Sequence, residues 1–192
     1  MDFESLDNGH DPRNGTVESN NGHAYNGPLS GNKGELREGG HRVPFVARWP
    51  GHIPAGAASG ELICLIDLMA TCAAITGQSL PQDAGPDTFN VLPALLGEAR
   101  DRPLREFLIL QAGSGDIGIR QGPWMLIPGD GGRGARKSSH LPQRNNARKD
   151  LLFNLSDNLK EKNNLAAEHP EKVKELAAIL QRACEEGRTR RP

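Results

Sequence analysis

Hydrophobic residues along this chain gather in short runs, separated by polar segments that are rich in glycine and proline. Residues 1–32 are polar and show little periodicity, so we expect a loop there. Residues 43–49 form an apolar run that predicts a buried strand, with Pro44 near its start. Pro50 and Gly51 are expected to end this strand, because proline and glycine interrupt regular structure.

A broad apolar stripe follows between Ser59 and Gly77. Ser59 is suited to cap a helix and Gly77 to end it. Asp67 is expected to be a structural, hydrogen-bonding residue of this helix. The stripe consists of Leu62, Ile63, Ile66, Leu68, Met69 and Ile75. A strand followed by a helix predicts an α/β layer in the first half of the chain.

The second half predicts a small sheet and a closing helix. Residues 91–97 are typical of a short helical turn that ends at Gly97. The polar, basic stretch 129–150 is expected to be an exposed hairpin loop. Strand-like runs occupy residues 106–111, 116–121, 124–127 and 151–155. The last helix is expected from 170 to 184, with one apolar side formed by Val173, Leu176, Ala177, Ile179 and Leu180. This order predicts an antiparallel sheet with a helix on one face.

Composition narrows the possible functions. The chain has 192 residues with 23 Gly, 14 Pro and only 4% aromatic residues, which indicates an incomplete hydrophobic core. Its formal net charge of -1, with both signs interspersed, excludes the basic face expected of a nucleic-acid-binding protein. No apolar run is long enough to span a membrane. The N-terminal residues lack the pattern of a signal peptide, which taken alone indicates a cytoplasmic protein.

The three cysteines, Cys64, Cys72 and Cys184, form no C-x-x-C pair and are odd in number. They therefore predict neither a zinc site nor a disulfide framework. Cys64 and Cys72 lie two turns apart in the expected helix, so we expect both to be buried as small apolar residues.

The most informative stretch is a glycine-rich loop around Lys33. Its sequence, GPLSGNKG at 27–34, continues into EGGHRVPF at 38–45 and RWPG at 48–51. Glycines let the backbone approach an anion closely, and a lysine among them supplies a point charge. The loop therefore predicts a site for phosphate or sulfate. The whole segment resembles the G-x-K-x-x-x-x-E-G-G-x-R-x-P pattern of the sulfatase family.

Further segments resemble the same family in the same order. They are LIDLMAT at 65–71, VLPALLG at 91–97, DLLFNLSD at 150–157 and EKNNLA at 161–166. This resemblance to arylsulfatase-type enzymes implies an alkaline-phosphatase-like α/β sandwich, of which the chain carries only the C-terminal part. We expect residues 1–100 to be the end of the catalytic α/β domain and residues 101–192 a small α+β subdomain.

The resemblance also implies site residues. Lys33 would be the catalytic and substrate-binding lysine, standing over the sulfate and binding an ester oxygen. Asp7 and Asn8 resemble the family's Asp-Asn metal pair and would be Ca²⁺ ligands; Asp7 lies 26 positions before Lys33. Carboxylate and amide oxygens suit such a hard cation. The rival segment SNNG at 19–22 has an amide where the pattern needs an aspartate, and we expect a turn there.

Residues close to Lys33 have simpler interpretations. Glu38 and Arg42 are expected to pair and stabilise the loop. His41 stands where the family accepts histidine or isoleucine, which argues against a chemical role. His10 and His23 are interpreted as bystanders in loops.

The family's nucleophile pattern, C-x-P-x-R, is absent from this sequence. In sulfatases its cysteine becomes formylglycine. Cys184 and Arg188 have the right interval but no intervening proline. We therefore expect a fragment that is inactive alone, with an incomplete Ca²⁺ site. The complete parent would hydrolyse a sulfate ester, such as a sulfated polysaccharide, to an alcohol and sulfate. The parent family is periplasmic or secreted, and the location of this chain stays open.

Two alternatives remain. The chain could be a non-catalytic remnant that binds sulfated glycan or a partner protein. It could also derive from a related phosphate-ester or phosphonate hydrolase, because the same fold hosts those reactions.

Overall fold

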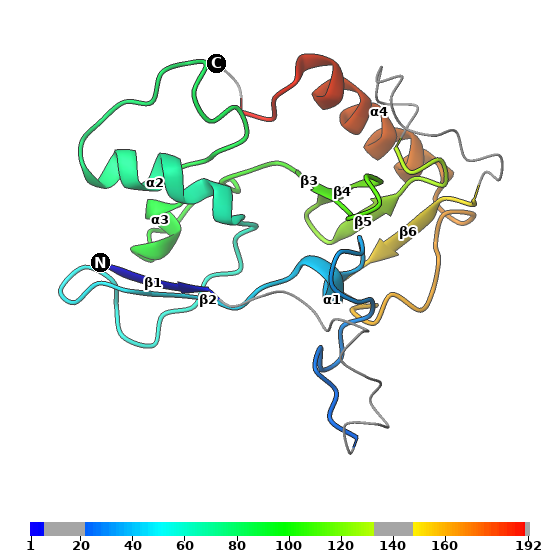
Figure 1. Ribbon diagram of the computed structural model, residues 1–192, viewed down its shortest axis with the longest axis horizontal. Helices are drawn as coiled ribbons and strands as arrows, with labels where there is room; N and C mark the ends of the chain where they lie inside the picture. The colour runs from blue at the N-terminus through cyan, green and yellow to red at the C-terminus, as the bar shows by residue number, and fades with distance from the viewer. Residues whose placement is uncertain (6–21, 133–147, 191–192) are drawn as a thin grey trace. The chain divides into compact units, whose positions relative to one another are not determined.

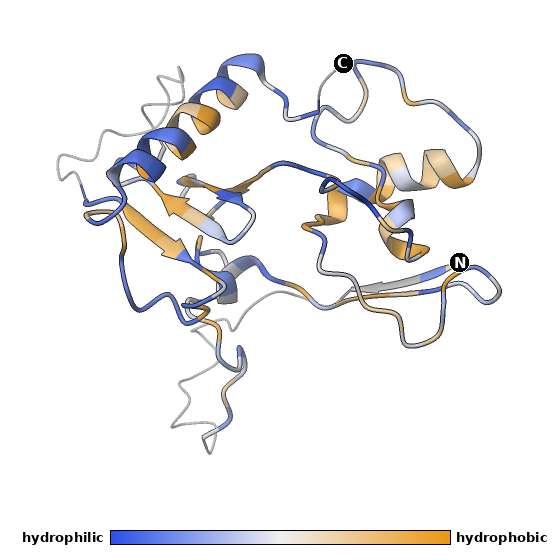
Figure 2. Ribbon diagram, turned by 180° about the vertical axis from the view of Figure 1, so that it is seen from behind, coloured by the Kyte–Doolittle hydropathy of each residue, from blue (hydrophilic) through white to orange (hydrophobic). Residues whose placement is uncertain are grey.

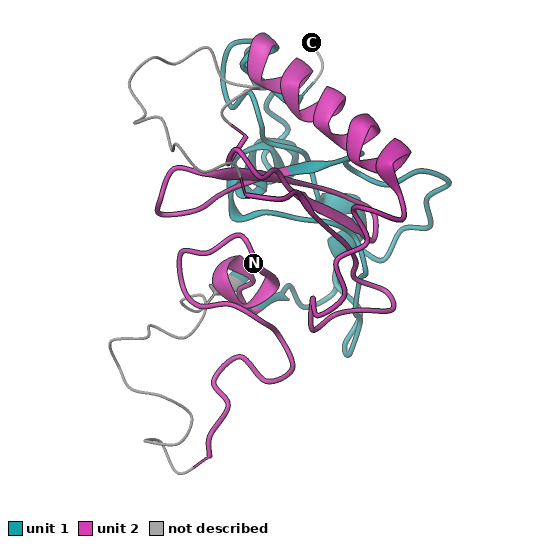
Figure 3. Cartoon of the chain, turned by 90° about the vertical axis from the view of Figure 1, so that its right-hand side faces the viewer, with its two compact units in different colours: residues 1–4, 45–108, 186–192 teal, residues 5–44, 109–185 magenta. Residues whose placement is uncertain are grey.

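The computed structural model describes residues 1–5, 22–132 and 148–190 (Figure 1). Contacts divide the chain into two compact units, which Figure 3 distinguishes by colour. Unit 1 comprises residues 1–4, 45–108 and 186–192, and unit 2 comprises residues 5–44 and 109–185. The Lys33 loop thus belongs to the same unit as most of the second half of the chain. The expected domain boundary near residue 100 concerns the complete parent and stays a prediction.

Unit 2 is built on a four-stranded sheet in the order β3-β4-β5-β6. Its strands are β3 (Leu108–Gln111), β4 (Ile117–Gln121), β5 (Trp124–Ile127) and β6 (Leu151–Asn154). β5 pairs antiparallel with both neighbours, Leu126 lying opposite Ile119 and Met125 opposite Phe153. This sheet confirms the predicted small sheet. Each of its strands carries apolar residues that can be buried. The middle of the expected 129–150 loop, residues 133–147, lies outside the described residues.

Helix α4 (Pro170–Glu186) completes unit 2 and confirms the predicted closing helix. Along α4 hydrophobic and hydrophilic residues fall on different sides, as Figure 2 shows. Leu176, Leu180 and Ala183 are its buried residues. Ala177 is exposed, so its expected place on the apolar side was wrong. The helix turns by about 100° per residue, which places Ala183, not Ala177, on the side of Leu176 and Leu180.

The core of unit 2 includes a residue from the Lys33 loop. Leu36 is 6% exposed and packs in a cluster with Ala112, Met125, Phe153 and Leu155. Burying a leucine side chain contributes about 1.5 to 3 kcal/mol. The loop that carries Lys33 is therefore anchored to the sheet by an apolar contact.

Unit 1 contains a two-stranded sheet, β1 (Asp2–Ser5) with β2 (Phe45–Arg48). The expectation of a loop through residues 1–32 was wrong for β1. The strand predicted within 43–49 is present, but its predicted burial was wrong, since Val46 is 61% exposed. Within the described residues β1 is the one strand that pairs with β2. Along β2 the half-buried Phe45 and Ala47 alternate with the exposed Val46 and Arg48.

The helix predicted at 59–77 begins later than expected. A 3-10 turn, η2 (Leu65–Asp67), leads into α2 (Leu68–Ile75). The Asp67 carboxylate accepts a hydrogen bond from the Cys64 amide at 2.7 Å, which starts the turn at residue 65. Ser59 accepts a bond from the Glu61 amide instead. Gly77, at φ +68°, ends the helix as predicted.

The side chains of α2 are less buried than the stripe predicted. Its one buried residue is Thr71, and Met69 is 49% exposed. Cys72 is exposed and Cys64 half-buried, so their expected burial was wrong. α2 is hydrophobic along most of its length (Figure 2), and its apolar residues are half-buried or exposed. Unit 1 also holds α3 (Leu92–Leu95), which confirms the turn predicted at 91–97.

None of the helices in the described ranges is long and apolar enough to cross a membrane.

Candidate functional site

Lys33 lies exposed in a turn whose backbone is fixed on both sides. Gly31 and Gly34 flank it at φ +87° and +84°, a region that glycine enters without a steric penalty. The Gly34 amide donates to the Gly40 carbonyl at 3.1 Å, and the Gly34 carbonyl accepts from the Gly113 amide at 2.8 Å. The turn is therefore tied both to itself and to the segment after β3.

The glycine pair at 39–40 allows the turn to close tightly. A Cβ atom on Gly40 would lie 2.5 Å from the carbonyl oxygens of Asn32 and Glu35. One on Gly39 would lie 2.7 Å from the Ser30 carbonyl oxygen, to which the Gly39 amide donates. Only glycine fits at these two positions, because the obstructing atoms are backbone.

Glu38 begins the short helix α1 (Glu38–His41) and is fully buried. Its carboxylate lies 3.3 Å from Arg120, 3.5 Å from His41 and 3.6 Å from Arg42. The predicted pairing of Glu38 with Arg42 is thus confirmed. Burial alone would raise the pKa of Glu38, but the His41 hydrogen bond and the charges of Arg120, His41 and Arg42 outweigh it and lower that pKa.

Glu161, from the EKNNLA segment, is a second buried carboxyl in the same place, at 2% exposure. Its Oε2 accepts hydrogen bonds from the Ser30 hydroxyl at 2.6 Å and from the Glu38 amide at 3.0 Å. Arg37 donates to the Glu161 carbonyl oxygen at 3.2 Å. Burial raises the pKa of Glu161, with a smaller contribution from the Glu38 charge, against the opposing Ser30, Glu38-amide and Arg37 interactions.

Sequence reasoning missed the role of Glu161. The resemblance marked its segment only as a family feature, and nothing local indicates that a residue at 161 meets residues 30–38. The one available signal was that Glu161 and Ser30 each lie in a segment that resembles the sulfatase family.

The described residues do not account for a calcium site. Within the ranges 1–5, 22–132 and 148–190 no group of three or more His, Cys, Asp or Glu residues could hold a metal ion. The expected ligands Asp7 and Asn8 lie outside the described residues, as do His10 and the rival segment 19–22. The assignment of Asp7 and Asn8 as Ca²⁺ ligands therefore stays a prediction.

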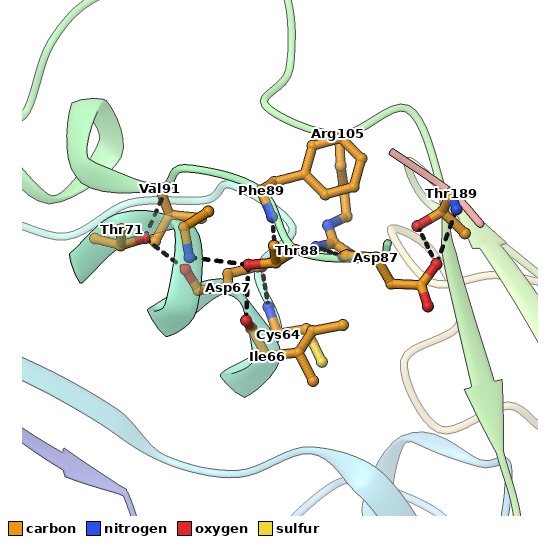
Figure 4. A network of polar contacts seen from close by, with 11 residues as sticks. Cys64, Ile66, Asp67, Thr71, Asp87, Thr88, Phe89, Val91, Arg105 and Thr189 are labelled. Atoms are coloured by element: carbon orange, nitrogen blue, oxygen red, sulfur yellow. Dashed lines mark hydrogen bonds and ion pairs between the residues drawn. The ribbon is translucent and has the colours of Figure 1, made fainter. Parts of the chain in front are cut away.

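A second polar cluster, in unit 1, is structural. Asp67 accepts hydrogen bonds from the amides of Cys64 and Phe89 and forms an ion pair with Arg105. The Thr71 and Thr88 hydroxyls join α2 to the segment before α3 (Figure 4). This confirms the expected structural role of Asp67. Burial raises the pKa of Asp67, and the two amides and Arg105 oppose that shift.

Comparison with known proteins gives these features a context. The chain is 35% identical over 161 residues to the N-acetylgalactosamine-6-O-sulfatase of Bacteroides thetaiotaomicron. The aligned region covers 84% of this chain and 31% of that protein. It is 44% identical over 80 residues to N-acetylgalactosamine-6-sulfatase of Homo sapiens, across 41% of this chain and 15% of that protein. No family model matches.

A solved structure reported with the metabolism of multiple glycosaminoglycans by Bacteroides thetaiotaomicron superposes with a TM-score of 0.72 at 35% identity, covering 88% of this chain and 34% of that one. The chain belongs to the sulfatase family, whose matched members are sulfuric ester hydrolases. It spans about a third of the length of the Bacteroides relative.

Proposed function

We propose that this chain is the C-terminal part of a glycan sulfatase, and that Lys33 binds an oxygen of the sulfate ester. The complete protein would hydrolyse the ester to an alcohol and inorganic sulfate. The sulfated substrate class is suggested by relatives named for N-acetylgalactosamine 6-sulfate and by one reported with glycosaminoglycan metabolism.

The observation that carries the proposal is the rigid presentation of Lys33. Lys33 is an exposed residue on a turn held by Gly34, by the close-packed Gly39 and Gly40, and by the Leu36 anchor. Preorganised positive charge favours a transition state in which negative charge grows on the ester oxygen, because the protein has no reorganisation left to do. A lysine on an unrestrained loop would lose much of that advantage.

The remaining parts of the site would come from elsewhere in the complete protein. The nucleophile would be formylglycine from a C-x-P-x-R segment, which this sequence lacks. Asp7 and Asn8 would supply two of the Ca²⁺ oxygens. We accordingly expect no turnover by the chain alone. Export to the periplasm or the exterior, as for the parent family, is part of the same proposal.

The proposal is tested by titrating the full chain with inorganic sulfate and with N-acetylgalactosamine 6-sulfate, followed by NMR. We expect binding that Lys33→Ala weakens about tenfold, since a charge-assisted hydrogen bond contributes about 1.5 to 3 kcal/mol. Lys174→Ala, on the exposed side of α4, is the matched control and leaves binding unchanged.

Two further measurements sharpen the test. Sequencing the genomic locus before Met1 should find a C-x-P-x-R segment, and the product that includes it should hydrolyse an aryl sulfate. Equal binding by the wild-type chain and Lys33→Ala would refute the role of Lys33. Tighter binding of phosphate than of sulfate, with phosphate-ester hydrolysis by the longer product, would favour the related phosphate-ester hydrolase.

A further inference from the structure

We propose that Glu161 is a positioning residue for Lys33. It acts as a hydrogen-bond acceptor that joins the two ends of the Lys33 turn, which runs from Ser30 to Glu38. The inference rests on the proposed function of Lys33 and extends it to the closing EKNNLA segment of the chain. Glu161 does not need to touch the substrate; it acts through the backbone on which Lys33 stands.

The hydrogen bonds of Glu161 reach residues on both sides of Lys33 in the sequence. Oε2 of Glu161 accepts from the Ser30 hydroxyl, three residues before Lys33, and from the Glu38 amide, five residues after it. The distances are 2.6 and 3.0 Å. One buried oxygen atom thus holds both ends of the turn, and it comes from a residue 131 positions after Ser30.

Arg37 reinforces the same connection. Its Nη1 donates to the Glu161 carbonyl oxygen at 3.2 Å and to the Ser30 hydroxyl oxygen at 3.3 Å. Its guanidinium carbon lies 5.4 Å from the centroid of the Phe153 ring in the core. Three contacts between the turn and residue 161 therefore share one buried location.

The backbone of Glu161 is itself constrained. Glu161 has φ +49°, the one positive φ found at a non-glycine residue in the described part of the chain. Its amide donates to the Asn158 carbonyl at 2.8 Å, which closes a turn. Such conformations persist where the surrounding structure determines them, and they concentrate at functional positions. The strained backbone aims the side chain at the Lys33 turn.

The unused oxygen of Glu161 makes a sharp test possible. Oε1 is buried and has no hydrogen-bond partner among the residues that the structure describes. In Glu161→Gln the amide oxygen can take over both bonds of Oε2, and the amide nitrogen occupies the place of Oε1. Glu161→Ala removes the acceptor altogether. Comparing these two variants separates the effect of losing the hydrogen-bond acceptor from the effect of losing the ionisable group.

The experiment measures amide hydrogen exchange in the full chain together with its titration by inorganic sulfate. In Glu161→Ala we expect exchange of residues 31–40 to rise at least about tenfold and sulfate affinity to fall at least about threefold. Exchange in β5 and β6 should be unchanged. Glu161→Gln should restore both values to within about twofold of wild type. Glu168→Ala, at an exposed position in the segment between Glu161 and α4, serves as control.

Each result of the exchange and titration measurements either supports or overturns the proposal. Wild-type exchange of residues 31–40 in Glu161→Ala, or a glutamine variant as impaired as the alanine variant, overturns the proposal. Should Glu161→Ala lose protection in β5 and β6 as well, Ser30→Ala replaces it, because that change removes one bond and leaves Glu161 in place. Faster exchange of residues 31–40 in Ser30→Ala supports the proposal, and unchanged exchange overturns it. A wild-type chain that binds no sulfate refutes the proposed function, while the exchange measurements alone then decide whether Glu161 holds the turn.

Discussion

Asp67 and Arg105 form an ion pair in which both side chains are 1% exposed. The pair joins the start of α2 to the segment that precedes β3. Unit 1 has few buried apolar residues, chiefly Val91 and Leu108, whereas Asp67, Thr71, Thr88 and Arg105 are all buried in it. Polar contacts therefore contribute an unusual share of the order within this unit.

The first prediction concerns this pair. Asp67→Ala should destabilise α2 by about 3 to 5 kcal/mol, because it leaves the Arg105 charge buried without a partner. Exchange of the α2 amides with solvent measures the effect. Asp83→Ala, on an exposed residue of the same unit, should change exchange by less than about 0.5 kcal/mol. The double variant Asp67→Ala with Arg105→Leu should recover part of the loss; a purely additive result would contradict the coupling.

The second prediction concerns acid. The pKa of Glu38 in the folded chain lies below its ordinary 4.5. Its ionised form therefore stabilises the folded state above about pH 4.5, and that contribution disappears as the pH falls through the lowered pKa. Glu38→Gln should be destabilised at pH 7, and its difference in stability from the wild type should shrink as the pH falls below 4.5. Urea unfolding at a series of pH values measures this, with exposed Glu35→Gln as control. A pH-independent difference would contradict the pairing.

The third prediction has the opposite sign. The pKa of Glu161 is raised above 4.5, with Glu38, Arg37 and Ser30 facing its carboxyl group. A raised carboxyl pKa favours the folded state below the unfolded value, and this contribution is lost as the pH rises through the folded pKa. Glu161→Gln does not titrate, so its stability relative to wild type should increase between pH 4 and pH 8. A relative stability that falls over this range would show that Glu161 is held ionised.

The fourth prediction tests the close packing beside Lys33. Gly40→Ala places a Cβ atom 2.5 Å from two backbone oxygens and should cost about 1 to 3 kcal/mol. The exchange of residues 31–40 should rise with it. Gly60→Ala is the matched control, since a Cβ at Gly60 would meet nothing within 4 Å. Equal stability of the two variants, measured by urea unfolding, would show that the turn relaxes without cost.

The sheet and helix of unit 2 could be predicted because each carries a local pattern. β5 occupies the predicted residues 124–127, and α4 begins at Pro170 as predicted. The buried residues Met125 and Leu126 of β5 and Leu176 and Leu180 of α4 all belong to the apolar patterns that predicted these elements. The elements themselves could therefore be predicted locally, although the burial of single residues such as Ala177 could not.

Unit 1 was harder to predict because its elements depend on single side chains. Ser59 is a good capping residue by type, yet the turn begins at residue 65, where Asp67 can reach back to the Cys64 amide. The apolar surfaces of α2 and β2 indicated burial that the described chain does not provide. An apolar pattern shows that a surface is stabilised by burial, but it does not show which segment covers that surface.

The candidate site divides in the same way. The glycines around Lys33 form a local motif, so the turn that they allow could be predicted from the sequence, whereas the role of Lys33 stays a proposal. Glu161 contributes through contacts across 123 and 131 positions, to Glu38 and Ser30. No local propensity encodes such a pairing. Asp7 and Asn8 stay predictions.

The division of the chain into units has a consequence for recombination between related genes. Residues 5–44 and 109–185 belong to one unit although residues 45–108 separate them in the sequence. A crossover anywhere in that intervening segment would combine the Ser30 to Arg42 turn of one parent with the Glu161 of another. Such chimaeras should keep an ordered turn only where both parents carry compatible versions of the two segments, so the two motifs are expected to be inherited together.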